Sequence, residues 1–121
     1  MPATTSKPYL VRRVQDAPTV RSECGQSTRP LAFPDVTACS LHVTFIKDST
    51  RHYHRACTEV YYILQGRGKM ELNEDVIDLE PGTVIYIEPG TWHRLYSDEG
   101  VRTIVFGVPA YRQDDEFYRK E

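Results

Sequence analysis

Four side chains have the types and the spacing expected of a metal site. They are His52 and His54, two residues apart, Glu59, five residues further on, and His93, which follows a Pro-Gly pair. Side chains alternate between the two faces of a strand, so His52 and His54 point to the same side. Three neutral imidazoles and one carboxylate suit Fe(II), Mn(II), Ni(II) or Zn(II), which favour nitrogen ligands with some oxygen. The set therefore predicts a site for a divalent transition metal.

Each part of this set alone would indicate little. A lone histidine on a strand is more often a hydrogen-bonded polar residue than a ligand; we assign that role to His42 and leave it out of the site. A His-x-His pair also arises by chance at polar strand ends. Glu59 has the wrong parity to share a face with the pair, so a tight turn within residues 55–58 is required. The complete set is much more specific than its parts.

The chain has the periodicity of an all-β protein. Short β-branched and aromatic runs alternate with turn signals, and no segment has a sustained helical period of apolar positions. We expect strands over residues 9–14, 38–46, 59–64, 68–72, 76–79, 84–87, 93–96 and 102–108. Such closely spaced strands favour a sandwich or a barrel. We expect a single domain over residues 9–110, flanked by a flexible N-terminal tail at 1–8 and a C-terminal tail at 111–121. The C-terminal tail could form a helical turn, but its run of charges favours a solvated terminus.

The two ligand segments resemble the two sequence motifs of the cupin superfamily. The first motif is matched by the stretch HYHRACTEVYYILQG, which places in register His52, His54, Glu59 and Gly66. The second is matched by GTVIYIEPGTWH, which supplies Gly82, Gly90 and His93. The chain departs from the usual motifs at Ile46, Glu88 and Ser97. None of these departures removes a ligand.

This resemblance implies a small single-domain cupin, whose fold is a double-stranded β-helix, also called a jelly-roll barrel. It implies a metal inside the barrel near its mouth, held by the three histidines and the glutamate. It also implies a homodimer, formed through the sheets or by exchange of N-terminal strands. The residues themselves agree on one further point, because a barrel with apolar inner positions and a polar cluster forms a site for a small molecule.

Further residues near the ligands are candidates for the wall that contacts this molecule. By strand parity, Tyr61 and Ile63 share the face of the glutamate ligand, and Leu95 shares the face of the third histidine. Tyr86 would lie below the second motif. The alternative, that these side chains belong to the core, stays open because tyrosine is common in barrels.

The charge and composition argue against several classes of partner. The 15 Lys and Arg residues against 17 Asp and Glu residues give a formal net charge of -2, so we expect no basic surface for nucleic acid. No apolar run approaches the length of a membrane span or resembles a signal peptide. The three cysteines include no Cys-x-x-Cys pair and fit a reducing interior. We therefore expect a cytoplasmic protein that binds neither nucleic acid nor membranes.

The leading hypothesis is a metal-dependent enzyme of the dioxygenase, isomerase or decarboxylase type. A hydroxy acid, diketone, catechol-like phenol or sugar would be polarised by the ion, and Glu59 can also accept a proton as a catalytic residue. The alternative is a non-catalytic cupin that binds or senses a sugar or an organic acid. Tight ligand binding without any product would favour this alternative.

Overall fold

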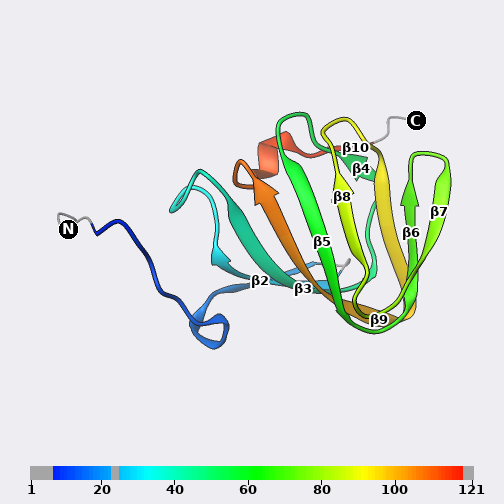
Figure 1. Ribbon diagram of the computed structural model, residues 1–121, viewed down its shortest axis with the longest axis horizontal. Helices are drawn as coiled ribbons and strands as arrows, with labels where there is room; N and C mark the ends of the chain where they lie inside the picture. Colours follow the sequence, from blue (N-terminus) through cyan, green and yellow to red (C-terminus); the bar gives the residue numbers. More distant parts are fainter. Residues whose placement is uncertain (1–6, 23–24, 119–121) are drawn as a thin grey trace.

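The computed structural model describes residues 7–22 and 25–118, and it confirms an all-β architecture. One hydrogen-bonded sheet curls round on itself, as Figure 1 shows. Its strands are β1 Thr19–Ser22, β2 Gly25–Leu31, β3 Ser40–Asp48, β4 His52–Tyr53, β5 Thr58–Gln65, β6 Gly68–Leu72, β7 Asp75–Leu79, β8 Val84–Ile87, β9 His93–Val108 and β10 Phe117–Tyr118. Two short 3-10 helices accompany them, η1 Val14–Asp16 and η2 Gln113–Asp115. Neither of these described helices has the length and apolar character needed to cross a membrane.

The long strand β9 organises the sheet. Its C-terminal half lies between β3 and β5, and its N-terminal half pairs with β6 and β4. The sequence predicted two separate strands here, but the structure has one continuous strand. The chain bends within it at Gly100, which has a φ of +99° and whose missing Cβ leaves room for the ring of Phe45. A single strand therefore reaches from the core to the candidate site.

Burial alternates along the strands, as expected for a sheet with one inner face. In β5, for example, Tyr61 and Ile63 are buried whereas Tyr62 and Leu64 are exposed. Most of the buried apolar side chains form one cluster, composed of Tyr61, Ile63, Met70, Leu79, Ile85, Ile87, Leu95, Val101 and Val105. The buried polar side chains are those of Ser40, His42, Thr44, His52, His54, Glu59, His93 and Thr103. The inner face thus divides into an apolar core and a polar region.

The two ends of the chain differ from the sequence prediction. Residues 9–13 have strand-forming types but form no strand, because local propensity does not supply a neighbouring strand to pair with. The polar hairpin of β1 and β2 was not predicted. The expected C-terminal tail contains η2 and β10, and β10 pairs with β4. Residues 1–6 of the expected N-terminal tail lie outside the described residues.

Candidate metal centre

The candidate ligands come from β4, β9, β5 and the loop after β4. His52 in β4 and His93 in β9 are direct register partners, and His54 comes just after β4 ends. The chain then turns, and β5 begins at Thr58 and presents Glu59 on its inner face. This turn gives Glu59 the parity that it needs to share a side with the histidines. All four candidate ligands are buried, with exposed fractions between 1% and 8%.

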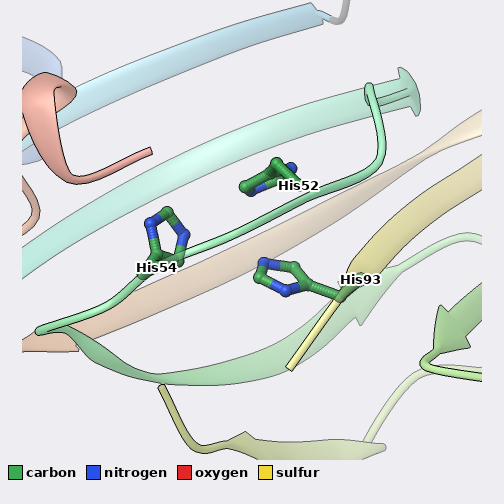
Figure 2. Close-up of side chains that lie close together, drawn as sticks. All are labelled: His52, His54 and His93. Atoms are coloured by element: carbon green, nitrogen blue, oxygen red, sulfur yellow. The ribbon is translucent and has the colours of Figure 1, made fainter. Parts of the chain in front are cut away.

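The three imidazoles lie close together inside the barrel, as shown in Figure 2. One ring nitrogen from each of His52, His54 and His93 lies within 4.8 Å of the other two. The Oε1 atom of Glu59 lies 3.3 Å from Nε2 of His54 and 3.3 Å from Nε2 of His93. Two ligand atoms bound at about 2.1 Å to one ion, and at right angles to each other, are about 3 Å apart. The two distances to Glu59 therefore fit ligands of a common ion.

Backbone carbonyls fix the tautomer of each histidine. The distance from Nδ1 to a backbone carbonyl oxygen is 2.6 Å for His52, 3.0 Å for His54 and 2.9 Å for His93. Because a carbonyl oxygen can only accept, each Nδ1 carries the proton and each Nε2 keeps its lone pair. Nε2 of His54, Nε2 of His93 and Oε1 of Glu59 are buried without a hydrogen-bond partner among the described residues. A divalent transition metal bound between these neighbouring atoms would supply the partner that each of them lacks.

The ionisation of the candidate ligands follows from their mutual contacts. Burial alone would raise the pKa of Glu59. The interactions of its carboxylate with His54 and His93 have a larger, opposite effect and hold that pKa well below its usual range. Burial lowers the pKa of His54, but Glu59 outweighs this effect and raises it above 6.5. Burial and the nearby His93 lower the pKa of His52. Glu59 is therefore an ionised carboxylate at neutral pH, and His52 is a neutral imidazole.

The C-terminal segment holds the loop that connects β4 to β5. The carboxylate of Asp115 accepts backbone hydrogen bonds from Arg55, Ala56 and Cys57, at distances of 3.0 to 3.2 Å. The backbone carbonyl of Asp115 accepts the hydrogen bond from Nδ1 of His54. One residue thus orients a candidate ligand and shapes the loop that follows it. The sequence placed Asp115 in a solvated tail, and the structure corrects that prediction.

A cavity of about 580 Å³ lies beside the histidines, which is enough for a small organic molecule. Tyr61, one of the predicted wall residues, lines it. Ile63 and Leu95 belong to the apolar core instead, where they are 0% and 1% exposed. Tyr86 is 65% exposed on the outer face of β8, because the alternation of that strand buries its neighbours. The predicted wall is therefore wrong for Ile63, Leu95 and Tyr86.

Several lining residues were missed by the sequence analysis, namely Arg29, His42, Tyr111 and Glu116. Oε2 of Glu116 lies 3.5 Å from Nε2 of His52, and the hydroxyl of Tyr111 donates to Oε1 of Glu116 over 2.7 Å. His42 was interpreted as a hydrogen-bonded polar residue, but its Nε2 has no partner among the described residues. Strand parity could have placed His42 on the inner face of β3. No local signal in the sequence marks Glu116.

Residues 41–107 match the family model described as a cupin domain, and this segment is more than half of the chain. The chain belongs to the cupin family. The matched segment includes all four candidate ligands and nearly all of β3 to β9. The cupin barrel predicted from the two motifs is thereby confirmed.

Relatives of this cupin include two archaeal proteins. An uncharacterized protein of Methanocaldococcus jannaschii is 35% identical over 66 residues, which cover 53% of this chain and 53% of the relative. A glucose-6-phosphate isomerase of Thermococcus gammatolerans is 39% identical over 56 residues, which cover 40% of this chain and 30% of the isomerase. The cupin thus spans about half of the first relative and less than a third of the second.

Solved structures share the fold of this cupin over most of the chain. A protein from Planctomyces limnophilus superposes with a TM-score of 0.82 and 26% identity, over 93% of this chain and 98% of that one. Ectoine synthase from P. lautus superposes with a TM-score of 0.75 and 20% identity, over 85% of this chain and 80% of the synthase. The second likeness shows the fold alone.

Proposed function

We propose that this cupin is a metal-dependent enzyme that acts on a small organic molecule inside its barrel. One observation carries the proposal. Three buried imidazoles, whose Nδ1 atoms donate to backbone carbonyls, lie close together beside a cavity. Their Nε2 atoms and the carboxylate of Glu59 are therefore available to bind one ion. A buried group of this kind without a metal would leave polar atoms unsatisfied. The names of an isomerase relative and a synthase with the same fold support an enzymatic role.

The residues that would hold the metal are His52, His54, His93 and Glu59, and the ion would be iron, manganese, nickel or zinc. A bound ion of this class supplies Lewis-acid polarisation of an oxygen on the bound molecule. The strongly lowered pKa of Glu59 makes it a weak proton acceptor and favours a role as ligand over a role as general base. The carboxylate of Glu116 also lines the cavity and is the candidate to take a proton from the bound molecule.

The reaction is of the dioxygenase, isomerase or decarboxylase type, and turnover assays test the proposal. The purified protein is loaded separately with each of the four metals and incubated with hydroxy acids, diketones, phenols and sugars, with products detected by mass spectrometry. We expect turnover by at least one loaded form, and its loss in His93→Ala. A complete absence of product with every metal would overturn the enzymatic role. Tight binding without product would instead identify a sensor or carrier cupin.

We also propose that the protein forms a homodimer through the outer face of its sheet. Neighbouring strands place exposed apolar side chains side by side there, as in the register pair of Tyr62 and Val84. This outer face, formed by β3, β5, β8 and β9, exposes Phe45, Tyr62, Leu64, Val84, Tyr86 and Phe106. A contiguous apolar surface of this kind is typical of a protein interface. A second copy of the chain offers the same surface and would cover it.

A further inference from the structure

His42 is a buried imidazole that lines the cavity and has no hydrogen-bond partner at Nε2 among the described residues. It lies on the inner face of β3 and is 6% exposed. Burial, and then the guanidinium of Arg29, lower the pKa of His42 to about 4, so its ring is neutral at pH 7. A buried polar nitrogen without a partner costs free energy. A bound molecule that forms a hydrogen bond with Nε2 would remove this cost.

Arg29 brings a positive charge to the same wall of the cavity. Its Nε atom donates to the hydroxyl of Ser27 over 3.0 Å, and its guanidinium lies 5.5 Å from the centre of the Tyr111 ring. Within residues 7–22 and 25–118, no carboxylate forms an ion pair with Arg29. The terminal N–H groups of a guanidinium form a planar fork that matches the two oxygens of a carboxylate. Arg29 therefore has donors available for an anionic ligand.

Tyr111 connects this polar pair to the candidate metal centre. Its ring packs edge-on against His42, with centroids 5.7 Å apart, and edge-on against His54, with centroids 5.8 Å apart. Arg29, His42 and His54 therefore all contact or approach one aromatic ring, and all line one cavity. A small molecule that extends along this ring can contact the candidate metal centre and the polar pair at the same time.

The charges around the cavity favour an anion at the polar pair. Among the described residues that line it, the acidic side chains are those of Glu59 and Glu116, and the basic side chain is that of Arg29. Two carboxylates and three neutral imidazoles balance the charge of a divalent ion. The positive charge of Arg29 is then left uncompensated inside the cavity. A ligand carboxylate would neutralise it.

We propose that Arg29 and His42 form a second subsite that binds a carboxylate. The molecule taken into the barrel is then a small organic acid, with its carboxylate at this subsite and another oxygen at the metal. This inference rests on the proposed function, because the other oxygen of the molecule is placed at the metal. The carboxylate subsite itself is formed by residues that are not candidate metal ligands. It narrows the substrate class to organic acids and disfavours neutral sugars and phenols.

Calorimetric titration with matched probes tests the subsite. The zinc-loaded protein is titrated with the dicarboxylates from malonate to adipate, and with the monoamide of each, which keeps one carboxylate for the metal and loses the second charge. We expect at least one dicarboxylate to bind at least about tenfold more tightly than its monoamide. Arg29→Gln should abolish this difference, and His42→Phe should reduce it. Arg102→Gln, which removes an exposed charge on β9, is the matched control and should leave it unchanged.

The possible results distinguish a failure of the carboxylate subsite from a failure of metal binding. Affinities for acid and monoamide that Arg29→Gln leaves unchanged at every chain length, or a preference for the acid that survives Arg29→Gln, would overturn the subsite. Circular dichroism and zinc content establish that the variants are folded and loaded. If the wild-type protein takes up none of iron, manganese, nickel and zinc, the proposed function fails, and the same titrations are made on the metal-free protein. Carboxylate binding that depends on Arg29 would then still support the subsite, and its absence would reject it.

Discussion

The backbone carbonyl of Asp115 accepts a hydrogen bond from Nδ1 of His54, a residue 61 positions earlier in the chain. The carboxylate of Asp115 also accepts hydrogen bonds from the backbone of residues 55–57. The segment after the barrel therefore fixes the ring of one candidate ligand and the loop that leads to another, Glu59. Partners of this kind orient ligands and adjust metal affinity.

Asp115→Ala should weaken zinc binding by roughly ten- to a hundredfold, because three backbone donors lose their acceptor and the loop after His54 is released. Affinity is measured by competition with a chelator, and the absorption spectrum of the cobalt-loaded protein reports the geometry of the ligands. Asp114→Ala is the matched control, since Asp114 is exposed and pairs with Arg112. Equal affinities and identical cobalt spectra for wild type and Asp115→Ala would contradict this role.

Metal affinity should rise as the pH rises above 6.5. The pKa of His54 is raised above 6.5, so in the metal-free protein its proton must leave before Nε2 can bind an ion. Affinity should fall by about tenfold for each pH unit below that pKa, as one proton competes with the metal, and should level off above it. The lowered pKa of His52 places its contribution below pH 6.5.

Zinc titrations between pH 6 and 8.5 measure this dependence. His42→Ala serves as the control, because the pKa of His42 is about 4 and its loss should leave the profile unchanged in this range. A flat profile would be inconsistent with His54 as a ligand.

Ile63→Ala should destabilise the fold by about 2–5 kcal/mol, because Ile63 is fully buried in the apolar core and its truncation leaves a cavity. Chemical denaturation of the metal-free protein measures the loss, and zinc content should remain at the wild-type level. Val76→Ala is the comparison, since Val76 is 55% exposed and lies on β7, outside the proposed dimer face. Unchanged stability together with weaker ligand binding would contradict the assignment of Ile63 to the core and would place it in the cavity wall.

Tyr62→Arg combined with Tyr86→Arg should convert a dimer to a monomer, because two charges would be buried against the outer face of the partner copy. Sedimentation velocity measures the change in mass. Val76→Arg is the control, because Val76 is 55% exposed on β7, which lies outside this face. The interface is assigned wrongly if the double variant sediments like the wild type.

The sequence predicted strands β5 to β8 well, because their signals are local. The bounds predicted for β6 and β8 agree with the structure, since apolar alternation and flanking turn residues mark both ends of each strand. The gathering of His52, His54, Glu59 and His93 also followed from two compact motifs. Their role as ligands is the proposal that the experiments above address.

The remaining parts of the site depend on contacts that no local pattern encodes. Asp115 and Glu116 lie in a charged stretch that resembles a solvated terminus, and they reach the site only because β10 pairs with β4. Tyr86 was placed in the cavity although alternation along β8 directs it outward. His42 was set aside because a lone histidine is an ambiguous signal, although the parity of β3 directs it to the cavity.

The most direct test is a crystal structure of the purified protein with anomalous scattering measured at the absorption edges of iron, manganese, nickel and zinc. We expect one metal ion per chain, bound by the Nε2 atoms of His52, His54 and His93 and by a carboxylate oxygen of Glu59. An ion bound elsewhere, or histidines that stay free of metal after incubation with each ion in turn, would contradict it.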